Sequence, residues 1–260
     1  MSKIAVITGA YGAIGKGIAE GMARHGYDLI MVGRNENALV VFVEELQKMY
    51  SKNRISYQVV DLSSENEIRD FAMSLKENIH VLINNAATCP VVRTETSDGT
   101  EIQFATNVLG YFRMILYLYQ KINSGGRIVN VASYWAGGLD LNDIEFRTRS
   151  YDNDSAYRQS KQANRMLSSF FAEKLKAFSI TVNACHPGDV NSKLSNDLGF
   201  GGHETPEQGA ATPVWLAVSK DVEGISGKYF EHQRQVNCRF SEDREAVQRL
   251  YNLCLEYCAH

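Results

Sequence analysis

The stretch that decides the fold of this 260-residue chain lies close to its start and reads Thr8-Gly9-Ala10-Tyr11-Gly12-Ala13-Ile14-Gly15. It follows a short strand-like run and precedes a helical pattern. Glycine permits a tight turn, close approach of the backbone to a ligand, and close packing of helix on strand. Because a helix N-terminus also presents free N–H groups, the loop predicts a site for a nucleotide phosphate. The alternative is a structural turn, since glycine is common in turns.

Strand-like and helical patterns keep alternating beyond this loop. We expect strands at 3–8, 28–32, 55–60, 80–84, 126–132, 180–185 and 228–230. We expect helices at 13–25, 36–49, 64–77 (opened by a Ser-x-x-Glu capping box), 101–122, 155–178 and 242–256. This order predicts an α/β fold with a doubly wound parallel sheet of about seven strands and helices on both faces. Without a repeat or a linker, residues 1–260 are expected to form one domain.

Composition excludes several classes of function. The formal net charge is −3 and no basic cluster occurs, so neither nucleic acid nor an anionic membrane is an expected partner. No run approaches the ~20 apolar residues of a membrane span, and Ile4 to Ile7 is too short for a signal peptide. We therefore expect a cytoplasmic protein. The five cysteines are odd in number and lack a Cys-x-x-Cys pair, which favours reduced thiols and predicts no metal site.

The residues after the second expected strand bear on the choice of dinucleotide. Folds that prefer NAD carry an acid there, whereas this chain has Gly33-Arg34-Asn35. Asp28 starts that strand and would lie roughly 15 Å or more from the ribose. A guanidinium suits a 2′-phosphate, so the sequence favours NADP(H) over NAD(H). A solvated surface arginine is the alternative.

Tyr157 and Lys161 form a candidate catalytic pair at the start of a long helix. Their i, i+4 spacing places them on one face, about 6 Å apart along the axis. A cation ~4 Å from the phenol would supply about 4 kcal/mol, or roughly three pKa units, and so activate it near neutral pH. This spacing is common by chance. Ser133 strengthens the case, because it follows the fifth expected strand at the sheet edge where such folds bind ligands.

Together these residues resemble the short-chain dehydrogenase/reductase family, which has a single-domain Rossmann fold. The resemblance runs from Ile4 to about Phe230 and includes Asn84-Asn85-Ala86-Ala87 and His186-Pro187-Gly188-Asp189-Val190. The closest branch in pattern is that of retinol dehydrogenases. Ala13 departs from the family, since single-domain members usually have glycine there. The resulting Thr-Gly-x-x-Gly-x-x-Gly pattern is that of longer, epimerase-like members. Because alanine is small, we still expect the loop to bind the cofactor.

The resemblance implies a role for each matching residue. Tyr157 would be the acid/base, Ser133 would hold the substrate oxygen, Lys161 would hold the nicotinamide ribose, and Asn107 would hold a water in a proton relay. The implied cofactor-binding residues are Gly9, Tyr11, Gly12, Ala13, Ile14, Gly15, Arg34, Asn35, Asp61, Leu62, Asn85, Ala86, Tyr157, Lys161, Pro187, Gly188, Val190 and Ser192.

The expected activity is therefore NADP(H)-dependent interconversion of a carbonyl and an alcohol by hydride transfer. Segments 134–136 and 89–92 are expected to line a mostly apolar substrate pocket, and glycine-rich residues 191–204 to form a flexible lid. A homodimer is expected from the family habit of pairing two long central helices. The alternatives are a non-catalytic NADP(H) sensor and a nucleotide-sugar epimerase.

Overall fold

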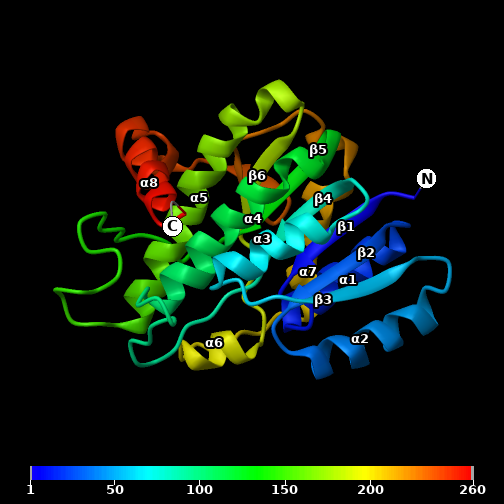
Figure 1. Ribbon diagram of the computed structural model, residues 1–260, viewed down its shortest axis with the longest axis horizontal. Coiled ribbons are helices and arrows are strands. Elements are labelled where there is room, and N and C mark those ends of the chain that lie inside the picture. The colour runs from blue at the N-terminus through cyan, green and yellow to red at the C-terminus, as the bar shows by residue number, and fades with distance from the viewer. Residues whose placement is uncertain (1, 259–260) are drawn as a thin grey trace.

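A single eight-stranded sheet forms the centre of the computed structural model, which describes residues 2–258 (Figure 1). The strand order is β3-β2-β1-β4-β5-β6-β7-β8. All neighbouring strands pair in parallel except β7 and β8. The strands are β1 Ile4–Thr8, β2 Asp28–Gly33, β3 Ile55–Val59, β4 Ile79–Asn84, β5 Ile122–Val131, β6 Thr181–Cys185, β7 Tyr229–Glu231 and β8 Arg234–Val236.

Helices cover both faces of this sheet. The helices are α1 Ala13–Arg24, α2 Glu36–Met49, α3 Glu65–Ser74, α4 Gly110–Leu118, α5 Asn153–Lys174, α6 Lys193–Asp197, α7 Pro206–Val218 and α8 Arg244–Glu256. One buried apolar cluster joins the sheet to α1, α2 and α7, and a second joins it to α3, α4, α5 and α8. The expected Rossmann fold is confirmed, with one strand more than the sequence indicated because β8 pairs antiparallel at the edge.

The long helix expected over 101–122 is wrong in detail. Residues Phe104–Leu109 form a π-helix, α4 follows, and a 3₁₀ turn at Tyr119–Lys121 ends it. Strand β5 then begins at Ile122 instead of at Gly126. A π-helix changes the direction in which side chains leave the helix, which local periodicity does not reveal. It occurs here around Asn107, one of the expected site residues.

Two helices were not expected at all. α6 lies inside the segment taken as a lid, and α7 follows it directly. The sequence does carry a signal for α7, a capping box in which Thr205 and Gln208 exchange side-chain hydrogen bonds with each other's backbone N–H. Close packing explains its glycine, since a Cβ on Gly209 would lie 2.2 Å from Cγ2 of Val190.

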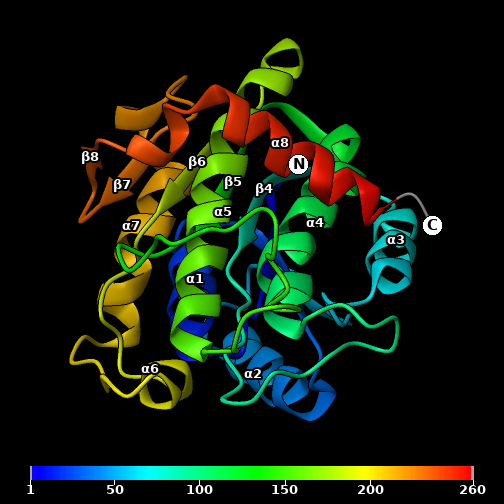
Figure 2. The same cartoon turned by 90° about the vertical axis from the view of Figure 1, so that its left-hand side faces the viewer.

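The C-terminal helix α8 lies across α4 and α5, as Figure 2 shows. Tyr251 stacks on Phe170 with ring centroids 3.9 Å apart and also contacts Phe112 and Phe171. Cys254 is fully buried in the same cluster. The face of the two central helices that α8 covers is therefore buried within the monomer.

The fold brings the ends of β1, β2, β4, β5 and β6 to one edge of the sheet. β1 and β4 are neighbours, and the chain leaves them toward opposite faces, which is where sheets of this kind bind ligands. Among residues 2–258, no helix is both long and apolar enough to cross a membrane. In the same described range, no three His, Cys, Asp or Glu side chains are placed to hold a metal ion.

Candidate active site

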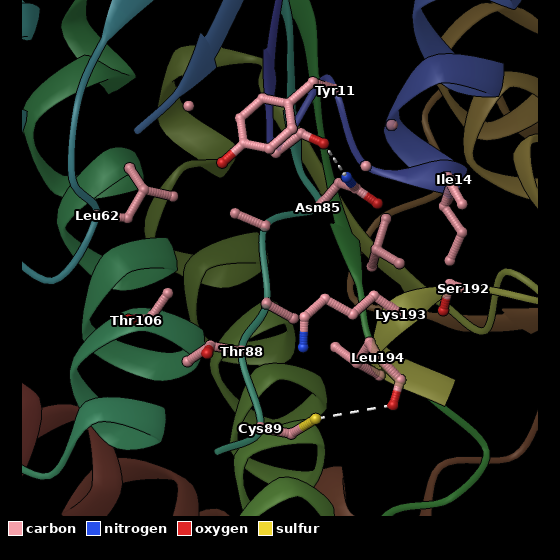
Figure 3. A pocket seen from close by; sticks show the side chains of 18 of the residues that line it. Tyr11, Ile14, Leu62, Asn85, Thr88, Cys89, Thr106, Ser192, Lys193 and Leu194 are labelled. Atoms are coloured by element: carbon pink, nitrogen blue, oxygen red, sulfur yellow. Dashed lines mark hydrogen bonds between the residues drawn. The ribbon is translucent and has the colours of Figure 1, made fainter. Parts of the chain in front are cut away.

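A crevice runs along this carboxyl edge, and most of the expected site residues line it (Figure 3). The expected residues in its wall are Gly9, Tyr11, Gly12, Ala13, Ile14, Gly15, Arg34, Asp61, Leu62, Asn85, Ala86, Tyr157, Lys161, Pro187 and Ser192. Among the other lining residues, Cys89 was expected at the substrate pocket, and Lys193, Leu194 and Asp197 fall in the segment expected to form a lid, whereas Thr88 was not singled out. Residues that follow β1, β2, β3, β4, β5 and β6 thus meet in one groove, because the carboxyl ends of parallel strands share one edge.

Tight backbone contacts shape the glycine loop between β1 and α1. Gly9 has a φ of +63°, and a Cβ there would lie 2.7 Å from the Cα of Ala86. A Cβ on Gly15 would lie 2.1 Å from the carbonyl oxygen of Gly9. Gly12 caps α1 in an extended conformation, so the first-turn N–H groups of α1 have no partner within the helix. The loop therefore leaves room and donors for a phosphate group.

Asn85 fixes this loop from the neighbouring strand. Its backbone N–H donates to Thr8 Oγ1 over 2.9 Å, and its Nδ2 donates to the carbonyl oxygens of Thr8 and Gly9 over 3.0 and 3.2 Å. Ala86 also donates its N–H to Thr8 Oγ1. The ends of β1 and β4 are thereby held together, and the carbonyl of Gly9 cannot turn toward the crevice without losing a hydrogen bond.

Arg34 is exposed and lines the far end of the crevice, beside Asp61 and Leu62. Asn35 does not line it, because its side chain accepts the N–H of Ala38 and caps α2 over 3.0 Å. Asp28 lies at the opposite end of β2, as the sequence indicated, and pairs with Arg54 at 2.7 Å. No carboxylate of β2 is therefore near the site that Arg34 could offer to a phosphate.

Tyr157 and Lys161 line the other end of the crevice, and Ser133 lies beside Tyr157 without lining the crevice itself. All three are nearly fully buried. Lys161 donates to the carbonyl oxygen of Val131 over 3.0 Å, and its Nζ lies 5.4 Å from the centre of the Tyr157 ring. The hydroxyl of Ser133 accepts the N–H of Trp135 over 3.0 Å, which leaves its own hydrogen free to donate. The i, i+4 spacing thus places Tyr157 and Lys161 on one face of α5, as expected.

The expected effect of Lys161 on the phenol is wrong for this structure. Burial raises the pKa of Tyr157 above its ordinary value, and the neighbouring Ser133 hydroxyl opposes this only in part. Burial also lowers the pKa of Lys161 to about 8. The sequence argument assumed a moderately polar surrounding, whereas both groups lie in the interior, where desolvation disfavours either charge. The phenol is consequently neutral at physiological pH.

Comparison with known proteins agrees with this geometry. Residues 3–199 match the family model described as short chain dehydrogenase. The chain belongs to the short-chain dehydrogenase family. Within it, the chain is similar to the retinol dehydrogenase-like branch: it is 30% identical to "Retinol dehydrogenase 13" of Homo sapiens over 272 residues, which cover 96% of the chain and 82% of the relative. It is also 34% identical to "Short-chain dehydrogenase TIC 32 B, chloroplastic" of Brassica napus, over 87% of the chain and 79% of that relative.

Solved structures share the fold of this chain. An uncharacterized protein from Mycobacterium paratuberculosis superposes with a TM-score of 0.84 at 26% identity, covering 98% of this chain and 92% of the other. A short chain dehydrogenase from Burkholderia cenocepacia, solved in complex with NADP, superposes with a TM-score of 0.72 at 20% identity, over 88% and 95% of the two chains. At the lower identity the likeness concerns the fold alone.

Asn107 lies within the π-helix and is fully buried. Its Oδ1 accepts the N–H of Thr88 over 2.8 Å, and its Nδ2 donates to the carbonyl of Thr88 over 2.9 Å and reaches Ser160 Oγ at 3.3 Å. Asn107 does not line the crevice. In this short-chain dehydrogenase its side chain ties the loop after β4 to α5, so it positions the wall that contains Thr88.

The residues of the family motif after β6, His186 to Val190, and the following Ser192 do not all line the crevice. Pro187 and Ser192 line the crevice, whereas Gly188 and Val190 do not. Gly188 has a φ of +117°, and a Cβ there would lie 1.8 Å from a carboxylate oxygen of Glu204. Val190 is buried and forms a bridge with Glu204. These two residues therefore anchor the segment that follows instead of forming the crevice wall.

The apolar segments expected around the substrate are only partly in the crevice. Cys89 lines it and is linked to Leu194 of α6 by an Sγ–O contact of 3.7 Å, drawn in Figure 3. Val91 and Val92 are about 70% exposed. Tyr134 and Trp135 lie past the end of β5 and are about half exposed. These four exposed residues do not line the crevice and lie beyond it at the same edge of the sheet.

Proposed function

We propose that this short-chain dehydrogenase is an NADP(H)-dependent reductase of aldehydes or ketones, with Tyr157 as the proton donor. Family membership supports an enzyme acting on CH–OH and C=O groups. The observation that carries the finer proposal is the burial of a neutral phenol at the crevice, next to Ser133 and above Lys161.

The reaction adds a hydride to the carbonyl carbon and a proton to the carbonyl oxygen. The reduced nicotinamide supplies the hydride when the cofactor is bound. Ser133 donates a hydrogen bond to the substrate oxygen, which stabilises the negative charge that grows there. Tyr157 then gives its proton to that oxygen. A raised phenol pKa keeps this proton in place until the reaction, as a proton donor requires.

Lys161 has two tasks in this proposal. Its ammonium stabilises the phenolate that remains after proton transfer, and it offers a hydrogen-bond donor toward the nicotinamide ribose. Its pKa near 8 means that most of the lysine is charged at pH 7. The contact with the Val131 carbonyl fixes the side chain in the crevice wall before ligands bind.

Arg34 supports the preference for NADP(H). It is the guanidinium at the adenine end of the crevice, and the acid of β2 points elsewhere toward Arg54. A 2′-phosphate gains charge-assisted hydrogen bonds from such a group, whereas a free ribose hydroxyl gains less. The three glycines of the loop leave space for a diphosphate at the N-terminus of α1.

An apolar carbonyl compound is the proposed substrate class. Cys89 and Leu194 form the crevice wall near Tyr157, and the exposed Val91, Val92, Tyr134 and Trp135 surround the sheet edge. Large apolar side chains left in solvent around a groove are typical of sites for apolar ligands. A panel of lipophilic and charged carbonyl compounds tests this, and activity confined to charged sugars would contradict it.

The decisive experiment follows NADPH consumption by wild type and by Tyr157→Phe. We expect the variant to lose roughly 10²–10⁴-fold in turnover, because it cannot donate the proton. Its affinity for NADPH, measured by calorimetry, should stay unchanged. Full turnover by Tyr157→Phe would refute the proposed role of the phenol.

The same assay separates the two alternatives. A non-catalytic sensor would bind NADPH without consuming it for any substrate, and an epimerase would retain NAD tightly and act on nucleotide sugars. The intact Ser133, Tyr157 and Lys161 favour the enzyme over the sensor. The homodimer and the cytoplasmic location stay predictions. If a dimer forms, it must use a surface other than the face of α4 and α5 that α8 covers.

A further inference from the structure

The short helix α6 supplies one whole wall of the crevice. Ser192, Lys193, Leu194 and Asp197 all line it. All four fall in the 191–204 segment expected to form a lid, but only Ser192 was expected to contact the cofactor. Ser192 caps the helix by accepting the N–H of Ser195, and the two serines complete a capping box. The segment starts beside the first turn of α1, because Val190 and Ile14 both contact the position of Gly209. The glycine loop and α6 therefore face the same groove.

Lys193 reaches into this groove from α6, as Figure 3 shows. Its Nζ pairs with Asp197 Oδ2 at 2.5 Å, one helical turn along. The two side chains are 88% and 36% exposed, so the pair is well hydrated. Exposed pairs of this kind contribute little free energy, because water solvates both charges almost as well. Little therefore holds the ammonium to its carboxylate.

The crevice wall formed by the glycine loop and α1 has the features of an anion-binding site. The loop of Gly9, Gly12 and Gly15 ends at the N-terminus of α1, where free N–H groups and the helix dipole attract a diphosphate. A lysine carries a compact charge on a flexible stem and binds phosphate as a point charge, without needing a fixed geometry. Lys193 is the cation that α6 contributes to the crevice wall.

We propose that Lys193 is a cofactor-positioning residue that exchanges the carboxylate of Asp197 for the diphosphate of the bound dinucleotide. In the free protein Asp197 pairs with the ammonium only weakly, and it competes with the cofactor for it. Binding of the dinucleotide is thereby coupled to the position of α6. The inference rests on the proposed function only in requiring a nicotinamide dinucleotide in the crevice.

Two variants test the exchange, because they should shift affinity in opposite directions. Lys193→Met should weaken NADPH binding about tenfold, as one charge-assisted contact is lost. Asp197→Asn should tighten it about two- to fivefold, as the competing carboxylate is removed. A pair that only stabilised α6 would make both variants weaker binders. Calorimetric titration of each with NADPH measures this, with Lys220→Met, at an exposed lysine at the other end of α7, as the matched control.

The double variant tests whether Asp197 acts through Lys193. In the Lys193→Met background, Asp197→Asn should no longer tighten binding, whereas an undiminished gain would mean that Asp197 repels the cofactor directly and would overturn the exchange. NADH should show the same loss as NADPH in Lys193→Met, because both carry the diphosphate. A loss confined to NADPH would assign Lys193 to the 2′-phosphate and would also overturn it.

Failure of this inference is distinguishable from failure of the proposed function. If wild type binds neither NADPH nor NADH, the proposed function is refuted and the exchange with it. If wild type binds and Tyr157→Phe loses turnover, but Lys193→Met and Asp197→Asn shift affinity in the same direction or not at all, only the exchange is refuted. Protection of the 191–204 segment from limited proteolysis by NADPH, diminished in Lys193→Met, gives a second readout independent of turnover.

Discussion

The two walls of the crevice are built in different ways. On the wall formed by β1, α1 and the end of β4, backbone atoms pack so closely that a Cβ on Gly15 would lie 2.1 Å from a carbonyl oxygen. On the wall formed by α6 and its flanking loop, a Cβ on Gly199 would meet nothing within 4 Å. The first wall is fixed by close backbone packing. The second is anchored by the buried Val190 and Ser195 but leaves open space around Gly199. We therefore expect rigid binding at the first wall and adjustable closure at the second, in two segments about 180 residues apart.

The largest expected contrast is at the fixed wall. Gly15→Ala should weaken NADPH binding roughly 100-fold, because relieving a clash with the Gly9 carbonyl costs about 1–3 kcal/mol and displaces the loop. Gly12→Ala is the matched control, since its Cβ would lie 3.3 Å from the same oxygen in an extended conformation, and it should change affinity by no more than about threefold. Equal losses in calorimetry would show that the loop is not shaped by this contact.

Substitutions of Lys161 and Lys193 test how a buried and an exposed charge of the crevice differ in their effect on stability. Lys161→Met should raise the free energy of unfolding at pH 7 by roughly 1–3 kcal/mol while abolishing turnover, because it removes a buried charge. In the folded protein the pKa of Lys161 is about 8, below its ordinary value, so wild type gains stability as the pH rises from about 8 toward 10. The advantage of the variant should therefore shrink over that range.

Urea denaturation at several pH values measures this effect. Lys193→Met is the control, because its side chain is 88% exposed and its loss should change stability by no more than about 0.5 kcal/mol. A Lys161→Met protein that is less stable than wild type at pH 7 would mean that the contact with the Val131 carbonyl outweighs the cost of burying the charge.

Arg34 gives a smaller effect at the end of the fixed wall. Arg34→Ala should weaken NADPH binding about tenfold and leave NADH binding unchanged, since only the 2′-phosphate is expected to use the guanidinium. Calorimetric titrations of wild type and Arg34→Ala with NADPH and with NADH give the ratio of the two affinities in each protein. Equal losses for the two would place Arg34 on the adenine or the diphosphate instead.

The smallest effect is expected at the adjustable wall. Gly199 has a φ of +84° with open space around it, so Gly199→Ala should cost about 1 kcal/mol of stability and change NADPH affinity by less than about twofold. Thermal unfolding and calorimetry measure the two quantities. A large loss of cofactor affinity would show that the lid is as tightly specified as the glycine loop, and the contrast between the walls would disappear.

The sequence determined much of the fold and the reacting end of the site. The order of strands and helices, the glycine loop, and the placement of Tyr157 and Lys161 on one helix face all follow from patterns within a few residues. Ser133 was found in the same way, because its place after β5 is read from the strand itself. Local periodicity and spacing are properties of the chain alone, so they survive whatever surrounds them.

Tertiary packing decided the rest. The π-helix around Asn107, the cover of α4 and α5 by α8, and the position of α6 in the crevice wall depend on segments that meet only after folding. Local signals for the two unexpected helices were present, in Thr205 and Gln208 for α7 and in Ser192 and Ser195 for α6. Burial also reversed the expected pKa of Tyr157. Desolvation depends on everything packed around a group, and one stretch of sequence does not contain that information.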